Sequence, residues 1–404
     1  MALIVQKYGG SSVATAERIK AVAARVGKVY DGGDQVLVVV SAMGDTTDDL
    51  IKLASQVTSD PHPREMDVLL STGELVASTL LAMAIKNLGY KAISLSGAQA
   101  GIKTDTTYRK ARIVKIETKR ILEELAEGQI VIVAGFQGIT DDMDVTTLGR
   151  GGSDTSAVAL AAALWAKICE RLTDTDGIYS ADPRVVPDAI RLDEIGYEEM
   201  LELATYGNKV MQPRAIELAE LYNIPIRVAS SFNDNPGTLI HGGVSMEVRN
   251  KVRSVAYDMD VAKISVVGIP DKPGIAASIF VPLAKAGISV DTIVQNSSVN
   301  KIADLTFTVT KDQINDAMKV AKPIAKKLGA TNIVSDTELG KVSIVGTGMQ
   351  NTPGFAAKMF DTLSGNGINI ELISTSEIRI TCIIKESKVK EAVRALHKAF
   401  EVEV

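Results

Sequence analysis

The sequence has little of several residue types on which enzymes often depend. Its 404 residues include only three histidines and two cysteines, and aromatic residues make up 4%. Cys169 and Cys382 stand far apart and share no CxxC or Cys/His spacing, so we expect neither a zinc site nor a disulfide framework. His62, His241 and His397 lie outside every glycine-rich motif, and no Ser/His/Asp arrangement is evident. The sequence therefore predicts no metal ion held by the protein.

Strong charge and long apolar segments are also missing. The net charge is −5 and the pI is about 5.5, which argues against nucleic acid or an anionic membrane as the main partner. The longest apolar stretch that we identify, residues 157–168, is well short of the roughly 20 residues that a membrane span needs. The first residues lack a basic segment followed by an apolar one, so they do not predict a signal peptide. We expect a cytoplasmic protein with no membrane and no nucleic-acid partner.

The sequence does contain apolar material for more than one core. Hydrophobic residues make up 46% of a chain that is too long for one average domain. Short apolar runs rich in β-branched residues are typical of strands buried on both faces, and they occur at 3–5, 36–40, 92–95, 130–134 and 226–228. Helical patterns lie between them, at 15–30, 74–88, 111–127 and 156–167. This alternation predicts an α/β sandwich with a mainly parallel sheet over residues 1–245.

The rest of the chain, residues 246–404, contains a tandem repeat. The segment KISVVG at 263–268 reappears as KVSIVG at 341–346. A Pro-Gly pair follows each copy, at 273–274 and at 353–354. In both copies the pattern reads strand, helix, strand, strand, helix, which indicates one structural unit used twice.

The repeat predicts two modules, a first at about 261–338 and a second at about 339–404. The second copy is short at its end, whereas residues 250–258 alternate like a strand before the first copy begins. We therefore expect the strand at 250–258 to complete the sheet of the second module.

Two glycine-rich segments are candidates for binding an anion. In KYGGSS at 7–12, two glycines and Lys7 follow the first predicted strand and could clamp a phosphate, although a tight turn with an exposed lysine would look the same. In TTLGRGGSDT at 146–155, three glycines precede an Ala-rich helix, whose N-terminus would favour an anion. Arg150 could hold a carboxylate through two hydrogen bonds. Asp154 could simply cap the helix, but capping alone explains neither Arg150 nor the glycines.

A third segment, TDTDGIYSADPR at 173–184, spaces carboxylates through a loop that contains glycine and proline. It could be a cluster of turns or a calcium loop. The EF-hand spacing is not met, so a calcium site of that kind is not indicated.

Together with STGE at 71–74 and GNKVMQPRA at 207–215, these three segments occur in the order expected of aspartate kinases. The chain resembles this branch of the amino acid kinase family over essentially its full length, and the tandem repeat resembles paired ACT domains. The resemblance implies an amino-acid-kinase-like α/β/α sandwich followed by two ferredoxin-like βαββαβ modules. It also implies that ATP, with Mg²⁺, phosphorylates the side-chain carboxylate of L-aspartate to 4-phospho-L-aspartate. That reaction is the first step toward lysine, threonine and methionine.

The resemblance also implies roles for individual residues. The catalytic residues are Lys7, Arg150 and Asp154, of which Asp154 organises the site around the transferred phosphoryl group. Aspartate is bound by Ser41, Thr47, Glu74, Arg150 and Ser153, with Glu74 on the ammonium and Arg150 on the α-carboxylate. ATP is bound by Lys7, Gly9, Gly10, Ser11, Thr173, Asp174, Tyr179, Asp182, Arg184 and Lys209. Because the substrate carboxylate is already ionised at pH 7, no general base is required, which agrees with the scarcity of histidine.

In the repeats, the resemblance implies an effector site for lysine, threonine or both. Its residues are Asp271, Gly274, Ile275, Ala276 and Gln295. The second copy has Gln350 or Asn351 in place of Asp271, so a site there would be degenerate or differently specific.

The oligomeric role of the repeats has alternatives. We expect a homo-oligomer formed through the ACT modules, and the modules could serve only this purpose. Met246 could start a separate regulatory subunit or be an ordinary linker residue.

Two alternatives to the main function are a relative that acts on glutamate or on a nucleotide monophosphate, and an amino-acid-sensing regulator whose kinase domain has decayed. The ACT pair, Glu74 and Arg150 weigh against the first, because they suit an α-amino acid. The intact Lys7, Asp154 and Asp182 weigh against the second.

Overall fold

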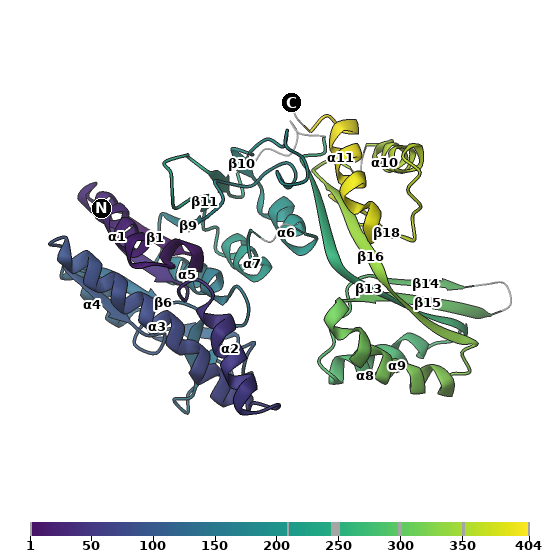
Figure 1. The fold of residues 1–404 in the computed structure, drawn as a ribbon, viewed down its shortest axis with the longest axis horizontal. Coiled ribbons are helices and arrows are strands. Elements are labelled where there is room, and N and C mark those ends of the chain that lie inside the picture. Colours follow the sequence, from purple (N-terminus) through teal and green to yellow (C-terminus); the bar gives the residue numbers. More distant parts are fainter. Residues whose placement is uncertain (1, 208–209, 244–250, 298–300, 350–351, 403–404) are drawn as a thin grey trace. The chain divides into compact units, whose positions relative to one another are not determined.

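The computed structural model describes residues 2–207, 210–243, 251–297, 301–349 and 352–402 (Figure 1). The chain divides into two compact units. The first consists of Met1–Tyr179, Arg191–Thr205 and Lys209–Ser245, and the second of Ser180–Ile190, Tyr206–Asn208 and Met246–Val404. The short segment Ser180–Ile190 therefore belongs with the C-terminal part of the chain.

The first unit is built on an eight-stranded sheet. In spatial order its strands are β10 (Glu194–Ile195), β12 (Thr238–Ile240), β11 (Ile226–Ser230), β9 (Ile168–Thr173), β1 (Leu3–Tyr8), β2 (Gln35–Val40), β6 (Ile130–Ala134) and β3 (Ala92–Leu95). All neighbours pair in parallel except β11 and β12. Because parallel strands point the same way, the carboxyl ends of β1, β2, β6 and β9 lie along one edge. The β-branched runs predicted five strands of this sheet, β1, β2, β3, β6 and β11, but not β9, β10 or β12.

Helices cover both faces of this sheet. On one face α1 (Ala16–Asp31) and α3 (Pro63–Asn87) pack together over the alternate residues Val36, Val38 and Val40 of β2. On the other face α5 (Gly152–Ala163) packs against β1, β2 and β9, with α7 (Pro213–Leu221) beside it. The remaining helices of the unit are η1 (Gly10–Val13), α2 (Thr46–Val57), α4 (Lys119–Ala126) and α6 (Tyr197–Thr205).

A second, smaller sheet lies in the same unit and corrects one prediction. Its strands are β5 (Ile113–Ile116), β4 (Ile102–Thr104), β7 (Gln137–Ile139) and β8 (Val145–Thr147). The predicted helix at 111–127 is wrong in its first half, because Ile113–Ile116 is a strand that pairs with β4 and the helix begins only at Lys119. Two β-branched residues in a row favour the strand locally.

Two other predicted helices differ at their ends. The helix predicted at 156–167 runs from Gly152 to Ala163, because Gly151 adopts a φ of 73° and turns the chain directly into the helix. The helix predicted at 74–88 begins at Pro63, which suits the first turn of a helix. Within the described residues, this helix α3 alone is long and apolar enough to cross a membrane by length and composition, although half of its apolar stretch is buried inside the protein.

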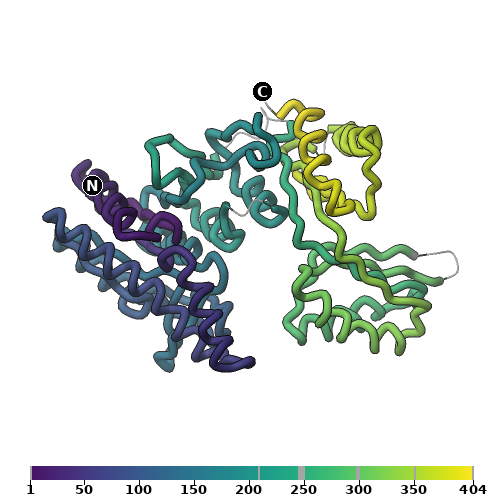
Figure 2. Tube along the Cα trace, viewed as in Figure 1, coloured from purple at the N-terminus to yellow at the C-terminus, as the bar shows by residue number. Residues whose placement is uncertain are grey.

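The second unit contains one six-stranded antiparallel sheet, whose chain trace can be followed in Figure 2. It has two large apolar cores and one small cluster of Val261, Leu339, Leu372 and Ile383. In spatial order the strands are β14 (Ile293–Ser297), β15 (Ile302–Val309), β13 (Ser254–Pro270), β16 (Asn332–Val345), β18 (Arg379–Lys385) and β17 (Leu372–Thr375). The helices are α8 (Ile275–Lys285), η2 (Lys311–Gln313), α9 (Ile314–Lys327), α10 (Phe355–Gly365), η3 (Glu386–Lys388) and α11 (Val389–Ala399).

The two long central strands, β13 and β16, serve both cores. The first part of β13, Ser254 to Asp258, pairs with Lys341 to Val345, whereas its later part pairs with β15 and with the start of β16. One core gathers the apolar faces of α8 and α9 around Leu305, and the other gathers α10 and α11 around Val342. The fold class predicted from the sequence is confirmed, since a mainly parallel α/β domain is followed by ACT-like modules.

The segment Ser180–Ile190 is part of the core that α10 and α11 form around Val342. Val185 and Val186 are buried there with Leu396 of α11. The hydroxyl of Ser180 lies 2.9 Å from Nε2 of His397, which is also buried. This loop is therefore anchored on α11.

Candidate active site

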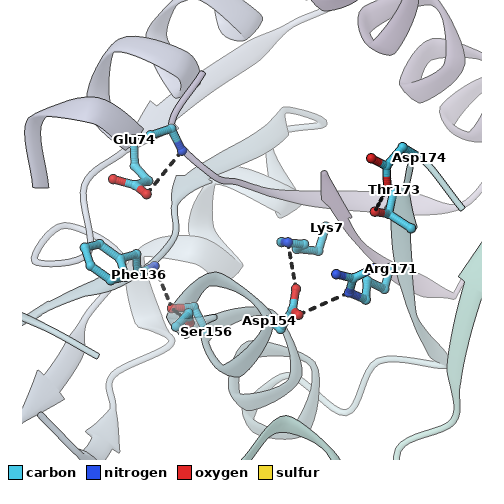
Figure 3. A network of polar contacts seen from close by, with 10 residues as sticks. Lys7, Glu74, Phe136, Asp154, Ser156, Arg171, Thr173 and Asp174 are labelled. Atoms are coloured by element: carbon cyan, nitrogen blue, oxygen red, sulfur yellow. Dashed lines mark hydrogen bonds and ion pairs between the residues drawn. The ribbon is translucent and has the colours of Figure 1, made fainter. Parts of the chain in front are cut away.

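The centre of the candidate site is a buried ion pair at the carboxyl end of β1. Lys7 points toward α5, where its Nζ lies 2.7 Å from Oδ1 of Asp154 (Figure 3). Arg171 on β9 donates from Nε to Oδ2 of the same carboxylate over 3.1 Å. The side chains of Lys7 and Asp154 are only 7% and 6% exposed. Two cations therefore share one carboxylate out of contact with bulk water.

Charge and burial shift the pKa values of these groups. Burial lowers the pKa of Lys7 below its ordinary value, Asp154 opposes the shift and Arg171 adds to it. Burial alone would raise the pKa of Asp154, but Arg171 and Lys7 together hold that pKa below its ordinary value. The two cations thus favour the ionised form of Asp154, whereas burial disfavours the charged form of Lys7 and only Asp154 counteracts this effect strongly.

The loop after β1 brings backbone groups close to the lysine. A Cβ on Gly9 would lie 3.8 Å from Nζ of Lys7 and 4.0 Å from Oγ1 of Thr173, so the glycine leaves its backbone open toward both groups. A Cβ on Gly10 would lie only 2.8 Å from the carbonyl oxygen of Ala42. Glycine at position 10 is therefore required by the packing of this loop against the loop that follows β2.

Glu74 enters the same region from α3. Its Oε1 accepts a hydrogen bond from the backbone N–H of Ala42 at 3.1 Å, whereas Oε2 is buried and makes no hydrogen bond within the described residues (Figure 3). Burial raises the pKa of Glu74 to about 7, against the lowering effect of the Ala42 N–H and of Lys7. A buried carboxyl group with one oxygen that makes no hydrogen bond is suited to bind a cationic partner. Gly73 makes this approach possible, because a Cβ there would lie 2.8 Å from the Ala42 methyl group.

The start of α5 is held close to the sheet by another glycine. A Cβ on Gly135, which follows β6, would lie 2.9 Å from Cβ of Ser153. The hydroxyl of Ser156 accepts a hydrogen bond from the N–H of Phe136 at 3.1 Å (Figure 3). Ser41 directly follows β2, and Ser153 lies against Gly135, which directly follows β6, so both predicted aspartate-binding serines are at the carboxyl edge of the sheet.

A residue that sequence reasoning missed, Asp67, fixes the segment that leads to Arg150. The Asp67 side chain is fully buried on α3, two turns before Glu74. It accepts hydrogen bonds from the N–H and the hydroxyl of Thr147, both at 2.8 Å, and from the N–H of Arg109. The available signal was an acidic residue seven positions before Glu74, because two helical turns would place both carboxyl groups on the same face of a helix.

Three other predicted site residues are more exposed to solvent. Arg150 is exposed in the loop between β8 and α5, and Thr47 is half-buried near the start of α2. Ser11 is half-buried in η1. The backbone oxygen of Ser11 accepts a hydrogen bond from the guanidinium of Arg18, whereas the side chains of the three residues make no hydrogen bond or ion pair within the described residues.

The predicted nucleotide segment is divided between the two units. In the first unit, Thr173 donates from its hydroxyl to Asp174, and Tyr179 donates from its hydroxyl to Asp176 at 2.7 Å. In the second unit, Asp182 accepts two hydrogen bonds from the guanidinium of Arg184 and one from the hydroxyl of Tyr257. Lys209 lies outside the described residues, as do Met246, Gln350 and Asn351.

Four of the predicted effector residues, Asp271, Gly274, Ile275 and Ala276, lie at the start of α8, and Gln295 lies on a strand. Asp271 is exposed, Gly274 caps the helix with a φ of 92°, and Ile275 is buried in the module's core. Ala276 is half-buried on the first turn, and Gln295 is exposed on the edge strand β14. Ile275 therefore has a packing role, whereas Asp271 and Gln295 are accessible.

The arrangement in the first unit is suited to joining two anions. It supplies two buried cations, Lys7 and Arg171, and a glycine loop whose backbone is accessible. It also supplies a separate carboxyl group, that of Glu74, which could bind a cation. Across the described part of the chain, no group of three or more His, Cys, Asp or Glu side chains could hold a metal ion.

Comparisons with known proteins agree with this geometry. Residues 2–230 match the amino acid kinase family, and residues 264–322 and 342–400 each match an ACT domain. An aspartate kinase from Stutzerimonas stutzeri is 50% identical over 404 residues, covering 100% of this chain and 98% of that protein. An aspartokinase from Corynebacterium glutamicum is 50% identical over 407 residues, covering 100% and 97%.

Solved structures of aspartate kinases are also similar to this chain. The crystal structure of Escherichia coli aspartokinase III in complex with aspartate and ADP (R-state) matches with a TM-score of 0.85 at 25% identity, covering 99% of this chain and 100% of that chain. The same enzyme in complex with lysine and aspartate (T-state) matches with a TM-score of 0.76 at 25% identity, covering 98% and 99%.

Proposed function

This chain belongs to the amino acid kinase family, among its aspartate kinases, and we propose how its own residues carry the reaction of that enzyme. The enzyme transfers a phosphoryl group from ATP to the side-chain carboxylate of L-aspartate and is regulated by amino acids through its ACT modules. The alternative of a regulator with a decayed kinase domain finds no support among its relatives.

The observation that carries the proposal is the buried cluster of Lys7, Asp154 and Arg171 beside the glycine loop. In the reaction two anions, the γ-phosphate and the substrate carboxylate, must approach each other, so catalysis consists of positioning and charge neutralisation. Lys7 with Gly9 and Gly10 would hold the phosphates. Asp154 would organise the groups around the transferred phosphoryl.

The aspartate would be recognised at its α-amino acid end. Glu74, whose Oε2 makes no hydrogen bond within the described residues, would pair with the ammonium group. Arg150, exposed beside the helix start, would bind the α-carboxylate through two hydrogen bonds. Ser41, Thr47 and Ser153 would line the pocket, which leaves the side-chain carboxylate free to attack the phosphate.

The nucleotide would bind as a complex with Mg²⁺, because phosphate oxygens are preferred ligands of this ion. The hydroxyl of Thr173, 4.0 Å from the Cβ position of Gly9, supports placing Ser11, Thr173 and Asp174 at the nucleotide. Tyr179 would contact it from the same unit. The resemblance to aspartate kinases also assigns Asp182, Arg184 and Lys209 to the binding of the nucleotide.

The domain organisation is proposed as a kinase domain at 1–245 and a regulatory region at 246–404. The modules would span about 261–338 and 339–404, the second completed by the strand at 250–258. The pairing of Ser254 to Asp258 with Lys341 to Val345 supports this division.

The regulatory region would bind lysine, threonine or both at Asp271, Gly274, Ile275, Ala276 and Gln295. A pair of variants tests this site, Asp271→Ala and Gln295→Ala, assayed with each amino acid. Feedback inhibition that is unchanged in both variants would show the assignment to be wrong. We also propose a cytoplasmic homo-oligomer that associates through the ACT modules, with a separate regulatory subunit beginning at Met246 as a further possibility.

The chemical identity of the product tests the proposed reaction. An acyl phosphate reacts with hydroxylamine to give a hydroxamate, whereas a phosphate ester does not. Incubation of the chain with MgATP, L-aspartate and hydroxylamine should therefore yield aspartyl hydroxamate in proportion to ADP. ADP formed from aspartate without any hydroxamate would exclude the carboxylate as the acceptor.

A further inference from the structure

Arg171 and Lys7 are register partners on two neighbouring parallel strands, β9 and β1. Side chains at the same level of adjacent strands point to the same face, so two positive charges stand side by side under α5. Like charges in such a position destabilise a sheet unless an anion lies between them. Asp154, near the N-terminus of α5, supplies that anion to both (Figure 3).

The charges in this cluster do not balance. Lys7 and Arg171 carry two positive charges and Asp154 carries one negative charge. The Nη1 of Arg171 is buried and makes no hydrogen bond within the described residues, and the whole side chain is only 14% exposed. A buried cationic donor without a partner is costly, and an anion that enters the site would remove the cost.

We propose that Arg171 is a positioning residue for phosphoryl transfer, which retains Asp154 in place when Lys7 turns from Asp154 to the phosphates of ATP. The inference rests on the proposed function of this site. Before the nucleotide binds, Lys7 and Asp154 are paired. When the ammonium group of Lys7 binds a phosphate instead, Arg171 keeps its hydrogen bond to Oδ2 of Asp154. The Asp154 carboxylate therefore keeps its negative charge and its orientation.

Few other ionisable groups act on this cluster. Cys169, two residues before Arg171 on β9, interacts with both Asp154 and Lys7, but burial raises the pKa of its thiol and keeps it neutral. Glu74 interacts with Lys7 from α3. On α7, Arg214 donates to the backbone oxygens of Leu148 and Ala111. Among the described residues, removal of Arg171 would therefore leave Lys7 as the single cation paired with Asp154.

The test compares Arg171→Gln, Arg171→Lys and the control Arg227→Gln. Arg227 lies on the next strand, β11, in register with Glu170, and so belongs to the opposite face of the sheet. The assay measures kcat for aspartate-dependent ADP release at saturating substrates from pH 6 to pH 8. The ratio of the variant kcat to the wild-type kcat is the readout, since it cancels the ionisation of the substrates.

We expect Arg171→Gln to lower kcat about 10- to 100-fold at pH 8, and the ratio to fall by a further factor of about five or more at pH 6, as Asp154 becomes protonated. Arg171→Lys should recover part of kcat and part of the pH dependence. Arg227→Gln should follow the wild type. A constant ratio across this range in Arg171→Gln, with or without a lower melting temperature, would overturn the proposal.

If Arg171→Gln fails to fold, Arg171→Lys decides the matter, because a lysine makes a weaker and less directional contact. Its kcat ratio should still fall toward pH 6, and a flat ratio at the wild-type level would overturn the proposal. Wild-type protein without aspartate-dependent ADP release would instead contradict the proposed function itself.

Discussion

Lys7 and Asp154 form a fully buried ion pair, 2.7 Å from Nζ to Oδ1, although they come from the first strand of the chain and from a helix in its middle. The pair holds the lysine at the carboxyl edge of the sheet before any ligand arrives. Such placement favours catalysis by preorganised charge, because the ammonium group is already close to the site that the phosphates would occupy.

The first prediction concerns this lysine. Lys7→Met removes the ammonium and leaves Asp154 paired with Arg171, so the fold should survive while the phosphates lose their cation. We expect kcat to fall about 100-fold or more. Steady-state ADP release measures this, and Lys20→Met, an exposed change on α1, is the control. A Lys7→Met enzyme within a factor of three of the wild type would exclude a catalytic role.

The second prediction concerns the pH dependence of aspartate binding. The pKa of Glu74 is raised from 4.5 to about 7, so the free enzyme carries a neutral Glu74 below that pH and a carboxylate above it. Only the carboxylate pairs with the substrate ammonium. The KM for aspartate should therefore fall about fivefold as the pH rises from 6 to 7, and about twofold more as it levels off toward pH 8.

Glu74→Gln provides the control for this profile. The glutamine can keep the hydrogen bond from Ala42 but has no charge to gain. We expect a higher KM for aspartate that stays flat between pH 6 and pH 8. A wild-type KM that does not change with pH, or a Gln variant with the wild-type profile, would contradict the role of Glu74.

The third prediction concerns Asp67. Asp67→Ala leaves the buried N–H of Thr147, its hydroxyl and the N–H of Arg109 without their acceptor, so the first unit should lose about 2–4 kcal/mol of stability. The loop that carries Arg150 should also lose its position, which raises the KM for aspartate. Denaturant unfolding and steady-state kinetics measure the two effects. Asp67→Asn, which keeps one acceptor oxygen, should show smaller changes in both.

The fourth prediction concerns the anchored loop of the second unit. His397→Ala removes the partner of Ser180 and a buried side chain from the core that holds Val185 and Val186. Because that loop carries Asp182 and Arg184, we expect a KM for MgATP that rises several-fold while the KM for aspartate stays unchanged. The neighbouring exposed Lys398→Ala is the control. A lower melting temperature with an unchanged KM for MgATP would confine His397 to a structural role.

The sequence predicted five of the eight strands of the main sheet because these are apolar runs rich in β-branched residues, such as the segment at 36–40, which is buried on both faces. It also revealed the tandem repeat, because the copies share letters at a fixed spacing. It failed at 111–127, where Ile113–Ile116 pairs with a strand distant in sequence. Local pattern cannot show such pairing.

The candidate site was also predicted only in part from the sequence. Glycine motifs pointed to Lys7 and Asp154, but which cation pairs with Asp154 depends on the register between β1 and β9, which is a property of the assembled sheet. Arg171 was therefore missed, although an arginine inside a central strand is unusual enough to be noticed. Asp67 was missed because its partners, Arg109 and Thr147, are distant in sequence.

The most direct measurement of the central claim is ADP release by the purified chain with MgATP and one acceptor at a time. L-aspartate, L-glutamate and UMP are compared, each with and without lysine and threonine. The account predicts ADP release that depends on L-aspartate, is far slower with the other two acceptors and is about 100-fold or more slower in the Lys7→Met variant. Release with glutamate or UMP at the same rate, or none with aspartate, would contradict it.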